Sequence, residues 1–493
     1  MKEFLTEVIA ADQMRRCGQL LLAADKLERL LVKQSAVSPR ELCAAYNLLG
    51  GCSAELGRVK RAAEAYRQAS EYAVEVDFKR EFYSNYLFFR HYRGDLQRNL
   101  QGDLWNYQQL FSGRKLFRHD KAQHQRRKIR LGYLSTDFYS HIVVNFSIQL
   151  FACYDHDRYE VFLYGRQTIE DRTTQQLQGM VDHWQNIGGL SYEAAAEKIY
   201  DDRIDILVDL SGHTNKGETL IICSYKPAPV QVCGIGWFNT TGLRAMDYFL
   251  TDIYCSPPGQ GDGAFMERLI RLPHTQFCYT PSEAVQEARW HYHVHERITF
   301  GSFNNFAKIT DDMLVLWLSI LNRVPGSRLL LKNSHQGAVH QQHALQIRAK
   351  HLGYQFGQIE LRMATDGPLD EYQEVDIALD PYPYPGGGTT CDALYYGVPV
   401  ITLAGRQHHA RFGVSILQNV GLGNLVAESL AEYEELAVAL AGEKNLLEKL
   451  HERLRQQMKQ SPLMDAQSYV RDMEMAYEEI WSAWQRKSVA GKC

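Results

Sequence analysis

Residues 375–405, VDIALDPYPYPGGGTTCDALYYGVPVITLAG, decide the fold class of this chain. An apolar run at 375–379 gives way to a segment rich in proline and glycine, and a second apolar run follows at 398–403. Helix-like sequence begins between them, at Thr389 and Thr390. A strand, a glycine-rich loop, a helix start and a second strand, in that order, predict a parallel α/β sheet.

The glycine-rich loop has the features of a phosphate site. Gly386, Gly387 and Gly388 let the backbone approach a ligand closely and adopt positive φ without a Cβ clash. The helix that follows offers N–H groups without intrahelical partners, the hydroxyls of Thr389 and Thr390, and the positive end of its dipole. Together these groups suit a phosphate. The same residues also fit a tight turn in which a threonine caps the helix, so the loop alone leaves both interpretations open.

Composition and charge narrow the class of protein. The 493 residues suffice for about three domains, and 45% hydrophobic with 23% charged residues is typical of a soluble globular protein. A net charge of −4 gives no electrostatic reason to expect nucleic acid or a membrane surface as partner. The longest apolar run, 313–321, is too short to span a bilayer, and the first residues lack the pattern of a secretory signal. The 10 cysteines show no metal-ligand spacing, which favours free thiols in a reducing cytoplasm.

Residues 1–111 are predicted to form an all-α domain. Residues 45–74 match the spacing of a tetratricopeptide repeat, and a weaker copy lies at 20–31. The residues that carry the match are Tyr46, Leu49, Gly50, Ala62, Tyr66 and Ala69. Gly50 and Ala62 are small where two helices of such a repeat press together, and Tyr66 fills the gap between them. We expect two or three stacked helix pairs that recognise a peptide or a subunit, or else a plain helical cap without a partner.

The basic stretch 112–128 is predicted to be a solvated linker. It has no aromatic interleaving and no nucleic-acid-binding motif, which disfavours a nucleic-acid patch. From residue 129 strands and helices alternate, and this pattern predicts one Rossmann-like domain at 129–285 and a second at 286–465, with a terminal helix at 466–493. Two such domains facing a cleft make up the two-domain plan known as GT-B, although topology alone does not give the reaction.

Seven motifs occur along the chain in one order: GYLSTDFYSH, DLSGHT, KPAPVQVCGIGWFNTTGLRAMDYFLTD, GSFNNFAKIT, LNRVPGSRLLLK, DIALDPYPYPGGGTTCDALYYGVPVITLAG and SPLMDAQSYVRDMEMAYEEIW. Together they resemble the catalytic region of the O-linked N-acetylglucosamine transferase and Spindly family over residues 129–484. The resemblance implies the GT-B fold and an inverting, nucleotide-sugar-dependent transferase that modifies Ser or Thr hydroxyls of proteins. The short helical arm and the lack of a large insertion between the two lobes resemble bacterial members.

The resemblance also implies roles for individual residues. Lys308 would hold the diphosphate of the donor, Asn305 would lie near the nucleotide, and Asp392 would bind the ribose. His141 matches the histidine proposed as base on the acceptor side, and His213 lies in the second polar loop of the family. The remaining positions on the nucleotide side are Gly387, Gly388, Thr389 and Thr390.

The chemistry of sugar transfer agrees with these assignments. Breaking the bond between sugar and phosphate leaves negative charge on the nucleoside diphosphate, and a lysine together with a helix N-terminus can stabilise that charge without a metal ion. The chain has no convincing DxD metal motif, and Lys308 follows a predicted strand in a polar loop, which favours a phosphate ligand over an ordinary surface lysine. Inversion needs a base near the acceptor hydroxyl or a water route for its proton. His141 is suited to act as that base or to form a structural hydrogen bond, and His213 suits a neutral hydrogen-bonding role or that of a base.

We therefore expect a cytoplasmic protein O-glycosyltransferase that uses UDP-N-acetylglucosamine and needs neither cofactor nor metal. A protein acceptor would bind through the arm and the cleft, with a flagellin or a surface adhesin as a sensible substrate, and the chain could form oligomers. Gly388 stands where animal enzymes carry a histidine, and Trp237-Phe238 stands where many relatives have Tyr-Pro. Transfer of glucose or fucose, and transfer to Asn, therefore stay open as alternatives. A non-catalytic helical-repeat scaffold is disfavoured because Lys308, Thr389, Thr390 and His141 are all present.

Overall fold

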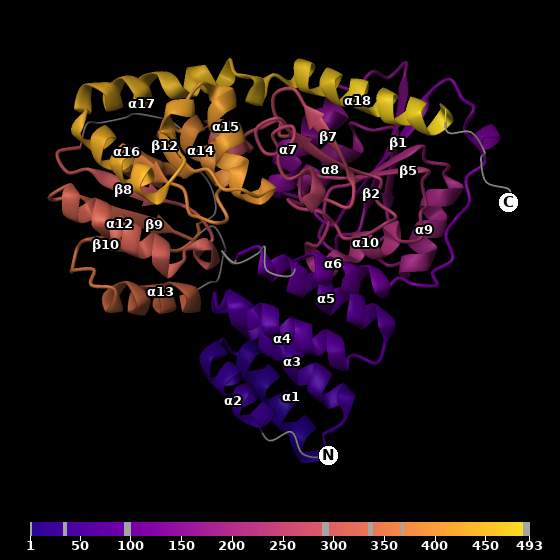
Figure 1. Cartoon of the computed structure of the whole chain (residues 1–493), viewed down its shortest axis with the longest axis horizontal. Helices are drawn as coiled ribbons and strands as arrows, with labels where there is room; N and C mark the ends of the chain where they lie inside the picture. Colours follow the sequence, from indigo (N-terminus) through magenta and orange to yellow (C-terminus); the bar gives the residue numbers. More distant parts are fainter. Residues whose placement is uncertain are drawn as a thin grey trace. The chain divides into compact units, whose positions relative to one another are not determined.

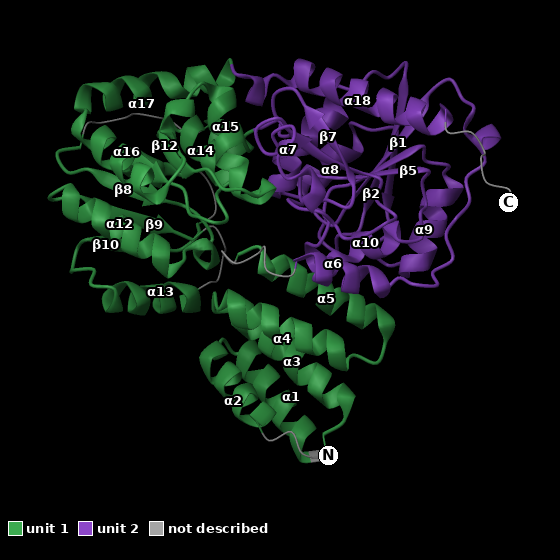
Figure 2. Ribbon diagram, viewed as in Figure 1, with its two compact units in different colours: residues 1–98, 281–460 green, residues 99–280, 461–493 purple. Residues whose placement is uncertain are grey.

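The structure is a computed structural model of the whole chain, and it describes residues 2–32, 37–92, 100–287, 295–333, 339–365 and 369–486. A helical N-terminal region is followed by two α/β regions (Figure 1). The chain divides into two compact units, one made of residues 1–98 and 281–460, the other of residues 99–280 and 461–493 (Figure 2). The first unit therefore combines the N-terminal helices with the second of the two sheets.

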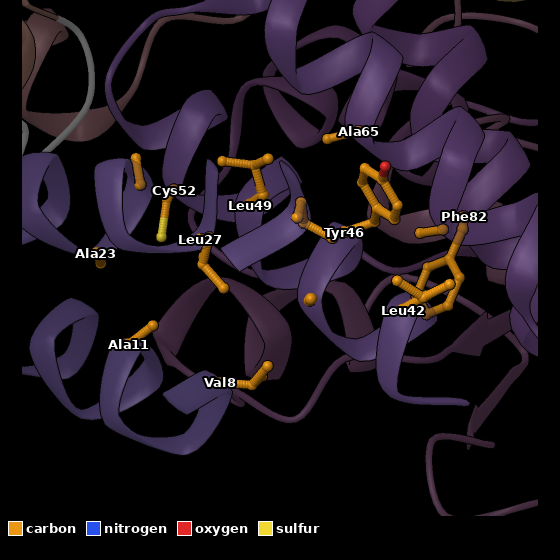
Figure 3. Close-up of a cluster of buried hydrophobic side chains, with 14 of the residues drawn as sticks. Val8, Ala11, Ala23, Leu27, Leu42, Tyr46, Leu49, Cys52, Ala65 and Phe82 are labelled. Atoms are coloured by element: carbon orange, nitrogen blue, oxygen red, sulfur yellow. The ribbon is translucent and has the colours of Figure 1, made fainter. Parts of the chain in front are cut away.

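The N-terminal helices pack in sequence, each against the next. They are α1 (Lys2–Arg16), α2 (Leu20–Val32), α3 (Pro39–Glu55), α4 (Val59–Tyr72) and α5 (Val76–Arg90). Ser38 caps α3 in a capping box with Glu41, so the start of this helix is fixed by its own sequence. A Cβ on Gly50 would lie 2.9 Å from the ring of Tyr66, which confirms the predicted close approach of α3 and α4 at this glycine. Alanines and leucines fill the space between the helices (Figure 3).

The first unit also contains a six-stranded parallel sheet in the order β10-β9-β8-β11-β12-β13. Its strands are β8 (Thr299–Ser302), β9 (Arg328–Lys332), β10 (Ile359–Arg362), β11 (Ile377–Leu379), β12 (Val400–Leu403) and β13 (Val426–Ala427). Its helices include α12 (Asp311–Arg323), α13 (Val339–His351), α14 (Gly388–Tyr395), α15 (Phe412–Val420), α16 (Leu430–Gly442) and α17 (Lys444–Lys459). The strand order reverses between β8 and β11, and in doubly wound sheets ligands bind beyond the strand ends at such a point.

The second unit is built on a seven-stranded parallel sheet in the order β3-β2-β1-β4-β5-β6-β7. Its strands are β1 (Ile129–Ser135), β2 (Tyr159–Gly165), β3 (His183–Asn186), β4 (Ile206–Asp209), β5 (Val230–Cys233), β6 (Tyr248–Asp252) and β7 (Arg268–Leu272). Its helices include α6 (Leu100–Gln109), α7 (Ile142–Ala152), α8 (Arg172–Gln178), α9 (Tyr192–Asp201), α10 (Glu218–Cys223) and α18 (Ala466–Arg486). The strand order reverses between β1 and β4, so both sheets have the predicted Rossmann-like topology of a GT-B fold.

The local sequence accounts for the burial of individual strands and for the start of α12. Every residue of β4 and β5 is buried, as expected of parallel strands that are covered on both faces. The apolar run 313–321 lies inside α12, where Thr310 caps the helix by accepting a hydrogen bond from the N–H of Met313 at 3.2 Å. None of the helices in the described part of the chain has the length and apolar character needed to cross a membrane.

Most of the segment 112–128 is exposed, and His124 is its one buried residue. His124 is buried, and its Nδ1 lies 2.6 Å from Oδ1 of Asp205, next to β4. The N–H of Phe117 donates to the carbonyl of Tyr225 at 2.9 Å. The basic stretch thus includes one buried histidine, whose partner lies 81 positions further along the chain.

Candidate active site

In the first unit, two polar loops follow the carboxyl ends of the neighbouring parallel strands β8 and β11. The loop after β8 carries Asn304, Asn305 and Lys308, and the loop after β11 leads through the glycines to α14. Because the two strands are parallel and paired, both loops emerge at the same edge of the sheet. The predicted phosphate residues from distant parts of the sequence are therefore brought together.

Asp380, directly after β11, organises the glycine-rich loop. Its Oδ1 accepts hydrogen bonds from the N–H of Gly386 at 2.7 Å and from Oγ1 of Thr390 at 3.3 Å. Its Oδ2 accepts one from Oγ1 of Thr402 on β12 at 3.0 Å. Burial raises the pKa of this carboxyl to about 6, while these hydrogen bonds and Lys308 act in the opposite direction. Sequence reasoning missed Asp380, although an aspartate directly after a buried strand was a signal for it.

Only glycine fits at position 386. A Cβ there would lie 2.4 Å from Oγ1 of Thr389, 2.5 Å from Oγ1 of Thr390 and 3.0 Å from Oδ1 of Asp380. The α14 helix begins at Gly388, and Gly387 is its N-cap without a side-chain hydrogen bond. The turn capped by a threonine, which the sequence left open, does not form here. The first N–H groups of α14 thus remain available to a ligand, as helix N-termini do when no side chain caps them.

The hydroxyls of the two threonines are held by neighbouring side chains. Oγ1 of Thr389 donates to Oδ1 of Asn304 at 3.0 Å, and Thr390 is bound to Asp380. Asn305, predicted to lie near the nucleotide, caps a short 3₁₀ turn by accepting from the N–H of Ala307 at 2.9 Å. The amide that links the two loops is therefore that of Asn304, which the prediction did not name. Asp392 lies on α14 and is half-buried.

Lys308 is a half-buried cation among neutral groups. Its Nζ donates to the carbonyl of Pro385 at 3.0 Å and lies 4.3 Å from the ring centroid of Tyr384. Within the described part of the chain, no carboxylate lies within ion-pair distance of this ammonium. Burial lowers the pKa of Lys308 to about 8, against the opposing attraction of Asp380. An ammonium beside a helix N-terminus, with its charge not directly paired, is suited to a phosphate group.

The end of α5 packs against this loop. The rings of Tyr92 and Tyr384 lie 5.0 Å apart, and those of His91 and His409 lie 5.2 Å apart at nearly a right angle. Burial lowers the pKa of both histidines, that of His91 to about 4, so both are neutral at physiological pH. Tyr384 thus has Tyr92 on one side and the ammonium of Lys308 over its ring.

In the second unit, His141 follows β1 and is the N-cap of α7. Its Nδ1 accepts a hydrogen bond from the N–H of Val143 at 3.3 Å. A neutral imidazole has one donor and one acceptor nitrogen, so this hydrogen bond assigns the proton to Nε2. His141 in this tautomer offers a substrate an N–H donor, and its acceptor nitrogen is already used by the helix.

His213 follows β4 and is 1% exposed. Its Nε2 lies 2.9 Å from the carbonyl oxygen of Thr241, which can only accept, so Nε2 carries a proton. The rings of Tyr107 and Trp237 lie 4.9 and 4.8 Å from its own. This arrangement favours the neutral hydrogen-bonding role over that of a base. Among the residues that the structure describes, no group of three His, Cys, Asp or Glu side chains is placed to hold a metal ion.

Comparison with known proteins gives one consistent result. The model of the family described as "Glycosyl transferase family 41" matches residues 109–280 and 279–473. The chain is 37% identical over 380 residues to an Arabidopsis thaliana protein named probable UDP-N-acetylglucosamine--peptide N-acetylglucosaminyltransferase SPINDLY, a match over 75% of this chain and 41% of that protein. A Petunia hybrida protein of the same name is 35% identical over 385 residues, which are 76% of this chain and 41% of that protein. The chain thus spans about two fifths of the length of these curated relatives.

A solved structure matches over nearly the whole length. A mutant of the Thermobaculum terrenum O-GlcNAc transferase superimposes with a TM-score of 0.83 at 27% sequence identity. The match covers 99% of this chain and 98% of that one, so it includes the N-terminal helices as well as both sheets.

Proposed function

Because this chain belongs to glycosyl transferase family 41, as its seven motifs predicted, we propose that it transfers N-acetylglucosamine from UDP-N-acetylglucosamine to Ser or Thr of a polypeptide. The names of the Spindly relatives and of the bacterial transferase support the donor and the acceptor class. The observation that carries the proposal is Lys308, whose ammonium has no paired carboxylate among the residues that the structure describes and lies beside the loop that opens α14.

The reaction we propose is a single displacement with inversion. The acceptor oxygen forms a bond to C1 of the sugar while the bond from C1 to the diphosphate oxygen breaks, and its electron pair leaves with UDP. Lys308 and the first N–H groups of α14 would stabilise that charge, so the step needs no metal ion. Thr389, Thr390 and the amide of Asn304 would line the phosphates, with Gly387 and Gly388 allowing their close approach, and Asp392 would accept from the ribose.

The proton of the acceptor hydroxyl needs a separate route. His141 uses its acceptor nitrogen to cap α7, which supports a role as hydrogen-bond donor to the substrate rather than as base. The hydroxyl proton would then leave through water. His213 would keep the neighbouring loop in place through Thr241, without itself accepting the proton.

The proposal also extends to the compartment and to the acceptor. None of the described cysteines forms a disulfide, which supports a reducing cytoplasm. The acceptor polypeptide would contact the helical arm as well as the catalytic units, and a flagellin or a surface adhesin is the acceptor that we would assay first.

The decisive experiment is calorimetric titration with UDP-N-acetylglucosamine, UDP-glucose and GDP-fucose, followed by mass spectrometry of polypeptides incubated with the enzyme. We expect the first donor to bind tightest and a mass increase of one N-acetylhexosamine on Ser or Thr. Preference for another donor, or a modified Asn, would replace this proposal by one of the alternatives. A chain that binds none of the three nucleotide sugars would instead be a scaffold.

A further inference from the structure

The second unit contains a pocket of about 250 Å³ at the carboxyl ends of three adjacent strands. Thr136 and Tyr139 line it after β1, Arg166 and Gln167 after β2, and Asn215 and Glu218 after β4. In a doubly wound sheet this edge, next to the reversal of strand order between β1 and β4, is where ligands bind. The pocket is smaller than the 300–1,000 Å³ or so of sites for drug-sized ligands. Its volume therefore suits a short piece of a larger molecule better than a nucleotide.

Gln167 is the unusual residue of this pocket. It is 5% exposed, yet neither Oε1 nor Nε2 of its side chain has a hydrogen-bond partner among the described residues. Leaving one such buried group unpaired costs about 1–3 kcal/mol. Native proteins contain few of them, and each calls for an explanation such as a ligand.

The glycine at position 165 leaves the space that the side-chain amide of Gln167 occupies. A Cβ on Gly165, the last residue of β2, would lie 2.5 Å from Oε1 and 2.9 Å from Nε2 of Gln167. Any other residue at position 165 would displace the amide, so the glycine creates its space. The unpaired amide is thus a built feature of the strand end and not the chance position of a surface side chain.

Arg166 and Asn215, which also line the pocket, already have hydrogen-bond partners. Nε of Arg166 pairs with Oε2 of Glu218 at 2.6 Å, and its Nη1 donates to the carbonyl of Ile187 at 3.1 Å. The amide of Asn215 donates to Oγ1 of Thr136 at 2.6 Å, although φ of Asn215 is +45°, a conformation that costs free energy for a residue other than glycine. Because Arg166 is paired with Glu218, its guanidinium is less available to an anionic ligand.

A primary amide that lacks both partners selects a particular ligand chemistry. It offers an N–H donor and a C=O acceptor side by side, so its ligand has to supply both an acceptor and a donor. In an extended polypeptide the N–H and C=O of one residue point to the same side, as they do when two facing residues of a sheet exchange both hydrogen bonds. The main chain of a peptide therefore complements Gln167.

We propose that the Gln167 pocket binds the main chain of the acceptor polypeptide, beside the residue that receives the sugar. The proposal rests on the proposed function, since it identifies one contact of that acceptor. Tyr139 lies between the Gln167 pocket and His141. It lines the pocket, and its ring lies 5.6 Å from the ring of His141. The peptide main chain would supply the two hydrogen bonds that Gln167 lacks.

The first test measures thermal unfolding of the full chain without any ligand. Gln167→Leu should raise the unfolding temperature, because it replaces an unpaired buried amide with an apolar side chain of similar size. The matched control is Gln178→Leu, an exposed glutamine of α8, which should leave the unfolding temperature unchanged. A lower unfolding temperature for Gln167→Leu would show that the amide has a structural partner, and the proposal would be overturned.

The second test titrates the ¹⁵N-labelled full chain with N-acetylglycine N′-methylamide, a blocked residue with both main-chain groups. The side-chain amide signal that is missing from the Gln167→Leu spectrum should shift in a saturable way. N-acetyl-N-methylglycine N′,N′-dimethylamide, which has no N–H, should leave it in place. An absent shift, an equal shift with the second probe, or a shift with free N-acetylglucosamine would each overturn the peptide assignment.

The outcome is separable from that of the proposed function. UDP affinity depends on residues of the first unit, so a chain that binds UDP but not the blocked glycine refutes only the Gln167 proposal. A chain that binds no UDP refutes the proposed function. With a polypeptide acceptor in hand, Gln167→Leu should raise its KM by about tenfold, which corresponds to about 1.4 kcal/mol, and should change kcat less.

Discussion

Lys308 and Asp380 both depart from their ordinary ionisation because they are buried. Burial disfavours the charged form, so it lowers the pKa of the lysine to about 8 and raises that of the aspartate to about 6. Both groups are therefore charged between these two values. Each serves a different partner, because Asp380 holds the loop and the ammonium of Lys308 remains for a ligand.

This ionisation predicts how UDP binding depends on pH. In the proposed role Lys308 binds the diphosphate only when protonated, so affinity should be constant well below pH 8 and fall by about tenfold per pH unit well above it. Lys308→Met should weaken UDP binding by about 10- to 100-fold, the loss of a hydrogen bond to a charged group, and should remove the dependence on pH. Calorimetry between pH 7 and about 9.5 measures both effects. A parent protein with equal affinity across this range would rule out the assigned role of Lys308.

His141 allows a test that separates its two roles. His141→Ala removes the cap of α7 and should lower the free energy of unfolding by about 0.5–2 kcal/mol. His141→Asn restores a good N-cap, so stability should recover, but its amide is too short to reproduce Nε2–H, and sugar transfer should stay low. Denaturant unfolding and a transfer assay compare the three proteins. Full transfer by His141→Asn would show that the cap alone matters.

At the scale of elements, the sequence predicted what depends on local pattern. The bounds of α12 follow from its apolar spacing and its cap at Thr310. The buried strands could be recognised as short apolar runs bounded by turn residues. In contrast, β3 escaped prediction because its four residues, HWQN, are neither β-branched nor fully buried.

The parts of the site that the sequence could not supply are side-chain pairings between distant elements. Asp380 acts through Thr402, which lies 22 residues away on another strand. Asn304 and Asn305 are adjacent amides, and only the three-dimensional structure shows that Asn304 reaches Thr389 while Asn305 turns back to cap its own loop. The unpaired amide of Gln167 is visible only when its surroundings are known.

The loop before α14 has a strict requirement for glycine that can be tested. Gly386→Ala places a methyl group against the hydroxyls of Thr389 and Thr390, and should cost about 1–3 kcal/mol of stability as overpacking does. UDP affinity should fall as well, since the start of α14 moves. Gly442→Ala is the matched control in the same unit, because a Cβ there meets nothing within 4 Å. Unfolding curves measure the stability of both variants, and calorimetry measures their affinity for UDP. Equal stability and equal UDP affinity of the two variants would refute the requirement for glycine at position 386.

At the scale of the molecule, the helical arm and the phosphate loop belong to one compact unit. Their connection passes from Tyr92 to Tyr384, whose ring lies under the ammonium of Lys308. All of these side chains are at least partly buried, so a ligand that orders the loop also restrains the end of α5. We therefore predict that the arm is coupled to the proposed donor site through packed aromatic rings, in addition to any contact that it makes with an acceptor.

Hydrogen exchange of the full chain tests this coupling. Saturating UDP should slow amide exchange in residues 380–395 and also in α5, because opening of α5 then has to break the packing of Tyr92 on an ordered Tyr384. Helix α1, which lies at the other end of the arm, serves as internal reference and should exchange at the same rate with and without UDP. Tyr384→Leu should abolish the protection of α5 while α14 remains protected by bound UDP. Protection confined to residues 380–395 in the parent protein would mean that the arm moves independently of the donor site.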